Sequence, residues 1–158
     1  MESLDPARDG AAARLLAASC DGSIDKAQTL LASTRADGAT VFARVIAGEI
    51  VAVAVVRIEG LTAELEAVAV DPGHRGQGHG EACLEHALRL VGHRPLAVET
   101  DEATLGFYRV GGFKLIGKRR RPDGTIHYRL AAHARLPQAA ALTLRRSPPG
   151  GKRSDGPA

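Results

Sequence analysis

The stretch V-A-V-D-P-G-H-R-G-Q-G-H-G, residues 68–80, sets the order of the elements on either side of it. A run typical of a β-strand ends at Asp71-Pro-Gly, and a segment with apolar residues at helical spacing begins at Gly80. The glycines between them let the backbone come close to a ligand, and free N–H groups at a helix N-terminus bind anions. The stretch therefore predicts a strand, a glycine loop and a helix, with a phosphate or pyrophosphate held at the loop.

Three kinds of glycine loop compete for this stretch. A Walker loop needs Gly-Lys followed by Ser or Thr, which is absent here. A dinucleotide fingerprint needs G-x-G-x-x-G, whereas Gly76, Gly78 and Gly80 place the third glycine one residue early. Glu99 keeps that interpretation open, because it stands about 20 residues further on, where such domains hold a ribose. The remaining pattern is [Q/R]-x-x-G-x-[G/A], which residues 75–80 satisfy.

The elements around the loop predict an α/β domain with a mixed central sheet and helices on both faces. Asp5 and Ser23 can each cap a helix, one that ends before Asp21-Gly22 and one that ends near residue 36. Residues 41–70 are rich in Val, Ala and Ile and are broken only at two tight turns, so they predict three antiparallel strands. Beyond the loop we expect a helix over residues 80–91, a parallel strand over 96–99, a helix over 103–110 and a hairpin formed by 113–118 and 125–130. A dinucleotide domain would lead with a strand and a helical crossover, so this order disfavours it.

A second block, E-T-D-E-A-T-L-G-F-Y-R-V-G-G-F at residues 99–113, follows the loop in the expected order. With the loop it resembles the GNAT superfamily of acyl-CoA N-acyltransferases, because Phe107, Tyr108, Gly112 and Phe113 stand on the positions of that family's F-Y-x-x-x-G-F ending. The resemblance covers roughly residues 8–130 and implies one acetyltransferase domain over residues 1–130. There is one departure. The family usually begins with a strand, and residues 1–4 are too short to predict a convincing one.

The resemblance also implies how acetyl-CoA is bound as co-substrate. Main-chain groups of Val68, Ala69 and Val70 would pair with the pantetheine arm as an added strand does, and the Val68 N–H could polarise the thioester carbonyl. The pyrophosphate would lie on the loop, formed by Arg75, Gly76, Gln77, Gly78, His79 and Gly80. We expect no metal, because no Cys, His or Asp spacing in the sequence is typical of a metal site.

Acyl transfer to an amine needs two groups that handle protons. An amine with a pKa near ~10 is protonated at neutral pH, so a base must take a proton, and the leaving thiolate needs one in return. Tyr108 resembles the family's general acid, and a phenol suits that role because it holds its proton at neutral pH. The structural alternative is a tyrosine ring that only packs on a helix face.

Glu64 and Glu66 are the candidates for the base. Two residues apart on a strand, they are expected on one side of the sheet, with Leu65, Ala67 and Ala69 on the other. When the chains are aligned on the glycine loop, both glutamates fall where serotonin acetyltransferases of the superfamily carry two histidines. Glu64 also falls where the family's histone acetyltransferases carry a glutamate base, so it is preferred. The alternative is a solvated strand face.

Composition narrows the class of protein. The chain has 158 residues, no Trp and 3% aromatic residues, so it predicts one domain whose core is built from Val, Ala, Leu and Ile. Cys20 and Cys83 lie in apolar helical patterns, and we find neither a signal peptide nor an apolar run of 18 residues. We therefore expect a reduced, soluble, cytoplasmic protein that does not bind a membrane.

Positive charge gathers in two places. Lys118-Arg-Arg-Arg121, beside the predicted hairpin turn, is either a solvated edge that deters strand pairing or a contact for an acidic substrate. Residues 131–158 hold five Lys or Arg against one Asp and are rich in Pro and Gly, which predicts a basic tail that is largely disordered. Without the tail the remainder is nearly neutral, so nucleic acid is expected to bind only through the tail, if at all.

The sequence thus predicts an N-acetyltransferase that moves an acetyl group from acetyl-CoA to a primary amine by direct attack in a ternary complex. The alternative is a non-catalytic acyl-CoA-binding or regulatory domain with a basic interaction tail. The sequence leaves open whether the acceptor is a small molecule or a protein, and whether the chain forms a homodimer.

Overall fold

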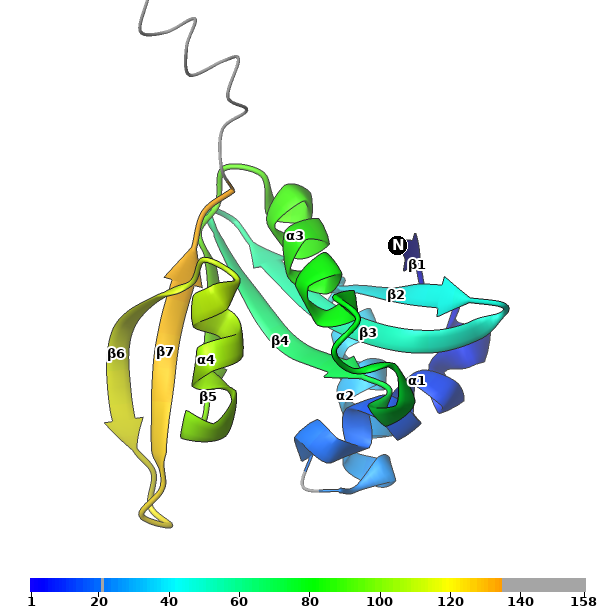
Figure 1. Ribbon diagram of the computed structural model, residues 1–158, viewed down its shortest axis with the longest axis horizontal. Helices are drawn as coiled ribbons and strands as arrows, with labels where there is room; N and C mark the ends of the chain where they lie inside the picture. The colour runs from blue at the N-terminus through cyan, green and yellow to red at the C-terminus, as the bar shows by residue number, and fades with distance from the viewer. Residues whose placement is uncertain (21, 135–158) are drawn as a thin grey trace, which may run out of the picture.

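A seven-stranded sheet forms the centre of the molecule (Figure 1), in a computed structural model that describes residues 1–20 and 22–134. The strands lie in the order β1-β2-β3-β4-β5-β7-β6. Their bounds are Glu2–Ser3 (β1), Thr40–Ile46 (β2), Glu49–Glu59 (β3), Thr62–Val70 (β4), Leu96–Thr100 (β5), Lys114–Arg120 (β6) and Ile126–Ala132 (β7). β4 and β5 pair in parallel, whereas the other neighbours pair antiparallel. The predicted mixed sheet with an antiparallel meander is confirmed.

Two helical segments begin at the predicted caps Asp5 and Ser23, and a third begins at a similar cap, Asp101. The α-helices are α1 (Asp9–Leu16), α2 (Ile24–Ala36), α3 (His79–Val91) and α4 (Glu102–Val110), with single 3₁₀ turns η1 (Pro6–Arg8), η2 (Ala17–Cys20) and η3 (Pro72–His74). Asp5, Ser23 and Asp101 each accept a hydrogen bond from a backbone N–H of the first turn that follows. The first predicted helix is divided, because its ends tighten into η1 and η2 around the short α1.

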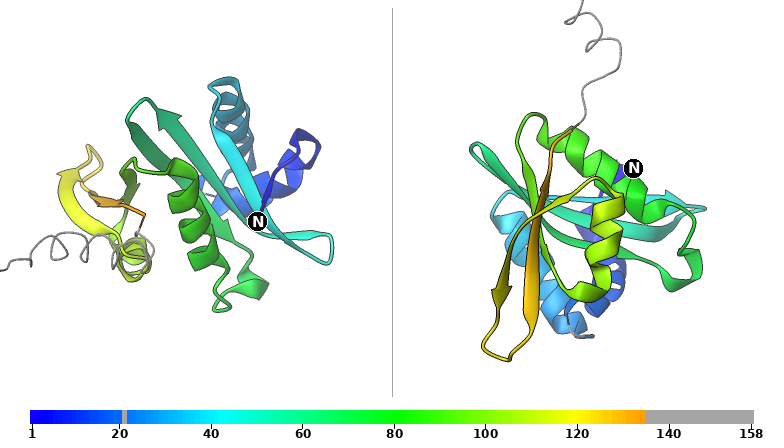
Figure 2. Two further views of the ribbon diagram at one scale, coloured as in Figure 1. Left: turned by 90° about the horizontal axis from the view of Figure 1, so that it is seen from above. Right: turned by 60° about the vertical axis from the view of Figure 1, so that its left-hand side comes forward.

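Helices cover both faces of the sheet, as the sequence predicts (Figures 1 and 2). α1 and α2 pack on one face, over a core that includes Leu16, Leu31, Val53 and Val55. α3 and α4 pack on the other, over a second core that includes Phe42, Leu84, Leu96, Phe113 and Leu130. Burial of these apolar side chains on both faces holds the central strands rigid, and the carboxyl ends of β4 and β5 lie between the two helix layers.

The N-terminus corrects one expectation. Residues 2 and 3 form a short strand, with Glu2 opposite Ala43 and Ser3 opposite Phe42. The N–H of Leu4 donates to the Val41 carbonyl at 2.9 Å, and the Leu4 side chain is buried. Two residues suffice here because the neighbouring β2 offers an unpaired edge and Leu4 enters the core, which offsets the entropy of ordering the segment. The expectation that this chain lacks the family's N-terminal strand was therefore wrong.

The last described strand, β7, ends at Ala132, so residues 131 and 132, the first two of the predicted disordered tail, belong to the sheet. The part of the predicted tail from residue 135 onward lies outside the described residues, as does Asp21 of the predicted break between the first two helices. Within the described residues, no helix is long and apolar enough to cross a membrane.

Candidate functional site

β4 contains a bulge at Glu66. Val55 of β3 lies opposite Ala67 and Val56 opposite Leu65, so Glu66 is the extra residue on β4. An extra residue shifts the alternation of side chains by one. Leu65 accordingly packs in the core under α3 and α4, whereas Ala67 packs in the core under α1 and α2. The expectation that Leu65, Ala67 and Ala69 share one face was wrong for this reason.

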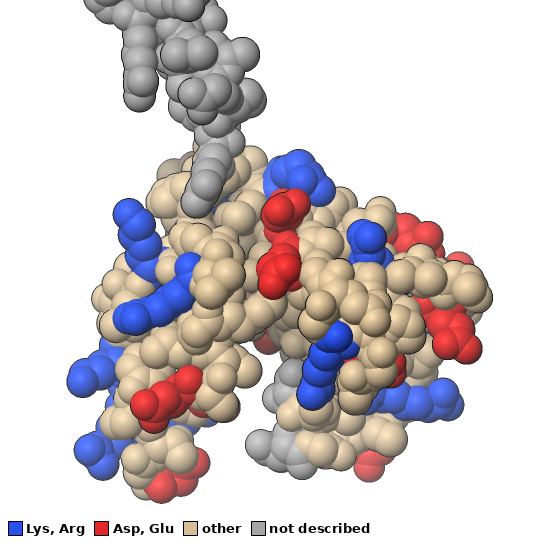
Figure 3. All heavy atoms as spheres, viewed as in Figure 1, with Lys and Arg blue, Asp and Glu red and all other residues tan. Residues whose placement is uncertain are grey.

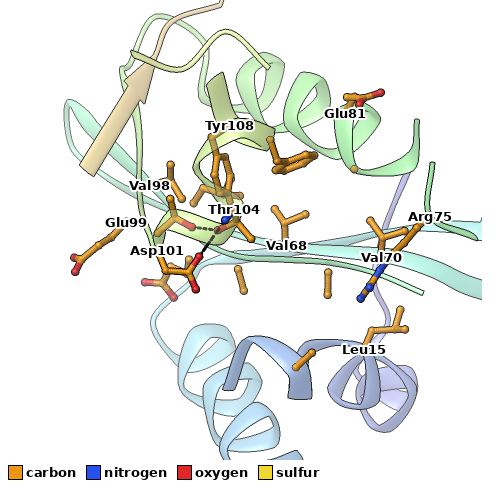
Figure 4. Close-up of a pocket in the computed structure, with 18 of the residues that line it drawn as sticks. Leu15, Val68, Val70, Arg75, Glu81, Val98, Glu99, Asp101, Thr104 and Tyr108 are labelled. Carbon is orange, nitrogen blue, oxygen red and sulfur yellow. Dashed lines mark hydrogen bonds between the residues drawn. The ribbon is translucent and has the colours of Figure 1, made fainter. Parts of the chain in front are cut away.

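β4 and β5 separate immediately before the bulge. They are paired only at Ala63 with Leu96 and at Glu64 with Ala97, so one edge of β4 beyond Glu64 has no partner strand in the described part of the chain. The gap opens into a pocket of about 910 Å³. Its walls come from residues 65–70 of β4, the glycine loop, residues 98–101 at the end of β5, α4, the segments α1 and η2, and the β6–β7 hairpin. Figure 4 shows Val68 and Val70 between Tyr108 of α4 and Leu15 of α1.

The glycine loop is shaped for an anion. Gly76 and Gly78 have φ of 76° and 82°, in the left-handed region that favours glycine, and Gly78 is the N-cap of α3. α3 is 13 residues long, and its first N–H groups have no intrahelical partner. Both glycines and the first turn of α3 line the pocket. A pyrophosphate fits this loop, because the N-terminus of α3 supplies N–H donors and the glycines have no side chains that would block an anion from reaching them.

Gly80 has a different role from the other two glycines. A Cβ added there would lie 2.9 Å from Cε1 of Phe107 and 3.5 Å from Cγ2 of Val70. Gly80 therefore lets the first turn of α3 approach α4 and β4 closely. The sequence predicts that Gly80 lets the backbone approach a ligand; in the structure Phe107 of the same chain lies close to it.

Hydrogen bonds brace the approach to the loop. Asp71 accepts from the Gly73 N–H at 3.0 Å and lies 2.8 Å from Nδ1 of His74. The contact with His74 and the Gly73 N–H lower the pKa of the Asp71 carboxyl, despite an opposing effect of burial. His79, the first residue of α3, is buried, with Nε2 at 3.3 Å from the Gln77 side-chain oxygen. These contacts order the two ends of the loop locally.

Tyr108 lies in α4, where its ring packs in the core and also forms part of the pocket wall. The residue is 8% exposed and contacts Phe107 and Phe113 edge to face, at ring centroid distances of 5.0 and 5.6 Å. Burial raises the pKa of the phenol to about 12, and the negative charge of Asp101 adds to the shift. The phenol therefore keeps its proton at neutral pH. Tyr108 is also among the residues that line the pocket.

Glu66 lines the pocket from the opposite wall. Its Oε1 forms an ion pair with Nε of Arg57 at 2.8 Å, and its Oε2 accepts from the hydroxyl of Thr34 in α2 at 3.5 Å. The Glu66 side chain is 17% exposed. The bulge thus presents one carboxylate to the pocket and holds it between β3 and α2.

Glu64 lies outside the residues that line the pocket. Nη1 and Nη2 of Arg129 donate to its two carboxylate oxygens at 3.1 and 3.0 Å. This bond raises the pKa of the Arg129 guanidinium, an effect that burial opposes and the Glu64 charge reinforces. Glu64 and Glu66 share a face of the sheet as expected, but the structure brings only Glu66 to the pocket.

The β6–β7 hairpin contributes wall residues that sequence reasoning did not single out. Asp123, Thr125 and His127 line the pocket, together with Glu99 at the end of β5. Glu99 accepts hydrogen bonds from Arg119 at 2.9 Å and from Arg121 at 3.0 Å, and these outweigh the effect of burial, so its pKa is lowered. Nothing in the sequence near Tyr108 points to the hairpin, because its approach depends on β7 inserting between β5 and β6.

The described residues contain no group of side chains typical of a metal site. Among residues 1–20 and 22–134, no three His, Cys, Asp or Glu side chains are grouped so that they could hold an ion.

Comparison with known families identifies the class of this domain. The profile of the acetyltransferase (GNAT) family matches residues 11–113, which include both sequence blocks and most of the pocket. The chain belongs to the acetyltransferase (GNAT) family, as the two sequence blocks predict.

Curated relatives match over part of their length. The peptidyl-lysine N-acetyltransferase YjaB of Salmonella typhimurium is 40% identical over 65 residues, which are 40% of this chain and 45% of that protein. The N-alpha-acetyltransferase RimI of Mycobacterium tuberculosis is 36% identical over 86 residues, which are 52% of this chain and 48% of that protein. The chain thus spans less than half the length of either relative in these matches.

The fold is shared with solved structures over nearly their whole length. An aminoglycoside 6′-N-acetyltransferase complexed with coenzyme A superposes with a TM-score of 0.73, over 85% of this chain and 95% of that chain, at 16% sequence identity. At that identity the similarity establishes the fold, and the predicted fold class is confirmed.

Proposed function

We propose that this protein transfers an acetyl group from acetyl-CoA to a primary amine by direct attack in a ternary complex. One observation carries the proposal: the glycine loop at the start of α3 and the buried phenol of Tyr108 open into the same pocket. An anion site and a proton donor in one pocket are what a phosphorylated thioester donor requires of its enzyme.

The donor would lie along β4. The pyrophosphate would be held by N–H groups of the loop, residues 75–80, with Gly76 and Gly78 leaving room for it. The pantetheine arm would pair with main-chain groups of Val68, Ala69 and Val70 along the edge that β5 leaves unpaired. The co-substrate supplies an activated carbonyl carbon, and the Val68 N–H would polarise that carbonyl.

The protein's side chains would move the protons. As the amine nitrogen bonds to the carbonyl carbon, the carbon–sulfur bond breaks and the sulfur leaves as a thiolate. A base takes the proton that the amine loses, and the Tyr108 hydroxyl gives its proton to the sulfur. The tyrosine then regains a proton from solvent, so that the net reaction yields the amide and a free thiol.

The base we favour is Glu66, because it lines the pocket whereas Glu64 does not. A water held by Glu66 could relay the proton if the amine does not reach the carboxylate directly. Glu64 is then a positioning residue, since its carboxylate joins β4 to Arg129 of β7. This assignment reverses the preference that the family resemblance suggests.

The acceptor we favour is an amine of a polypeptide, either a lysine side chain or an N-terminus. The support is that both curated relatives described above act on such amines by name. A cytoplasmic location is consistent with this acceptor and with the buried free thiol of Cys83.

A direct assay tests the function. The protein, acetyl-CoA and a panel of peptides and small amines are incubated together, and free thiol release is measured with the acetylated product identified by mass spectrometry. We expect thiol release that depends on the acceptor. Tight binding of acetyl-CoA without transfer to any acceptor would support the non-catalytic alternative instead.

A further inference from the structure

A second groove, of about 370 Å³, lies on the β6–β7 hairpin. Tyr128 and Leu130 of β7 pack into the core under α4, so the residues that alternate with them, His127 and Arg129, project from the opposite face. We call this feature the hairpin groove; it is lined by Glu99, Gly117, Lys118, Arg119, His127 and Arg129.

Gly117 creates the hollow. It lies opposite Arg129 in the pairing of β6 with β7, and a Cβ added to it would meet no atom within 4 Å. Its φ lies outside the left-handed region, so the backbone does not require glycine at this position. The missing side chain leaves open space over Arg129, on the face that Arg119 and His127 share.

The hairpin groove carries excess positive charge. Arg119, Arg121 and Arg129 have side chains that are 67%, 44% and 46% exposed, and Lys118 is exposed as well. Among the described residues, only two carboxylates, Glu99 and Glu64, pair with arginines of this face, so the four cations keep a net positive charge. Figure 3 shows Lys and Arg gathered along the left-hand edge of the molecule, over β6.

The hairpin groove continues from the main pocket. Glu99 and His127 line both, and Nδ1 of His127 lies 3.5 Å from Oε1 of Glu99. A chain that places an amine near Tyr108 could therefore pass this pair of residues and extend over the hairpin. A small amine would end inside the main pocket.

β6 adds a free edge to the groove. It is the last strand of the sheet, all seven of its residues are exposed, and no described strand pairs with its outer side. Such an edge can accept an extended peptide as a further strand. Basic side chains on an edge often serve only to deter pairing, but they would not repel a strand that is itself acidic.

We propose that the hairpin groove binds an acidic segment of the polypeptide acceptor, so that the protein prefers amines with Asp or Glu residues nearby in the sequence. The inference rests on the proposed function and narrows its substrate class. Carboxylates of the acceptor would meet Lys118 at the groove and the exposed parts of Arg119 and Arg129. A nucleic acid fits less well, because Glu64 and Glu99 interrupt the positive face, whereas phosphates form an unbroken series of charges.

Two short peptides test the preference. Both carry one free N-terminal amine and one lysine, and they differ only in that three Asp residues of the first are Asn in the second. We expect kcat/KM to be about tenfold higher for the Asp peptide at low salt, because several partly exposed ion pairs each contribute modestly. The preference should shrink as ionic strength rises.

Two variants and a control test whether the preference for the Asp peptide arises at the hairpin groove. Lys118→Ala removes a cation that has no ion pair among the described residues, and Gly117→Val fills the hollow. Each should lower the ratio of the two kcat/KM values about threefold or more. Lys114→Ala is the matched control, since it removes the same charge from β6 outside the groove and should keep the ratio of the unchanged protein. Arg119 and Arg129 are left unchanged because they hold Glu99 and Glu64.

The outcomes separate this inference from the proposed function. Equal transfer to both peptides, or an undiminished ratio in Lys118→Ala and Gly117→Val, would overturn the inference and leave the acetyltransferase function intact. If neither peptide is acetylated, fluorescence anisotropy of the labelled peptides still decides: tighter binding of the Asp peptide that Lys118→Ala abolishes supports the groove. Displacement of the labelled Asp peptide by a single-stranded RNA oligonucleotide, at lower concentration than by the unlabelled peptide, would assign the groove to nucleic acid and overturn the inference.

Discussion

Arg129 of β7 donates hydrogen bonds of 3.1 and 3.0 Å to the two carboxylate oxygens of Glu64 in β4, across the intervening strand β5. Glu64 is also the last residue of β4 that pairs with β5. The pair therefore joins the two halves of the sheet at the point where they begin to separate. A carboxylate so engaged is suited to holding the cleft open at a fixed width.

Replacing Glu66 should affect the chemistry more than replacing Glu64. Glu66→Gln keeps the size of the side chain and removes the carboxylate from the pocket, so we expect turnover to fall about 10²-fold or more at neutral pH. Part of the rate should return in alkali, where more of the amine is already deprotonated. Glu64→Gln should retain most of the turnover with an unchanged pH profile. A larger loss in Glu64→Gln than in Glu66→Gln, measured as kcat against pH, would return the base to Glu64.

Tyr108→Phe should separate binding from turnover. The substitution keeps the ring against Phe107 and Phe113 and removes only the hydroxyl, so acetyl-CoA affinity by calorimetry should be nearly unchanged. Turnover should fall about 10²- to 10⁴-fold, the usual contribution of general acid–base catalysis. The matched control is Tyr128→Phe, because Tyr128 is the other tyrosine of the chain and lies outside the pocket. Full turnover in Tyr108→Phe would exclude the phenol as the acid.

Gly78→Val should weaken acetyl-CoA binding beyond its cost in stability. A side chain at Gly78 would be strained at φ of 82° and would stand where the pyrophosphate is expected. Gly48→Val is the matched control, since Gly48 has φ of 83° in the β2–β3 turn, has open space around it and lies outside the pocket. Both variants should lose similar thermal stability, while calorimetry should show an affinity loss of about tenfold or more in Gly78→Val alone. Equal affinity in the two variants would show that the loop does not hold the donor.

Alkaline pH should destabilise the protein partly through Tyr108. The folded pKa of about 12 lies above the value of 10.0 for an exposed phenol, so the folded state binds the proton more tightly. This contribution to the free energy of unfolding is fully present below pH 10 and is lost as the pH rises toward 12. The loss amounts to about 2 kcal/mol at pH 12.

Chemical denaturation of the unchanged protein and of Tyr108→Phe, at several pH values from 9 to 12, measures this contribution. The curve of Tyr108→Phe should be flatter between pH 10 and 12. Cys83, whose pKa burial raises to about 11, titrates in both proteins, so its effect cancels in the comparison. Parallel curves would mean that the phenol is not buried as the structure shows.

Local sequence determined the elements and the class of this protein. The helix caps at Asp5, Ser23 and Asp101, the two tight turns between residues 41 and 70, and the glycine loop before α3 all depend on side chains within a few residues of one another. The same local chemistry predicted an anion site at the loop and marked Tyr108 within a recognisable block. These features could be read without the fold, because turn and cap preferences act over short distances.

The composition of the pocket was decided by tertiary structure. The bulge at Glu66 exists only in the pairing of β4 with β3, and it moved Ala67 and Ala69 to the opposite face from Leu65. The choice between the two glutamates likewise depended on Arg129, which lies 65 positions from Glu64 in the sequence. Strand order and register arise from contacts between distant segments, so no local pattern could show that Glu66 lines the pocket whereas Glu64, bound by Arg129, lies outside it.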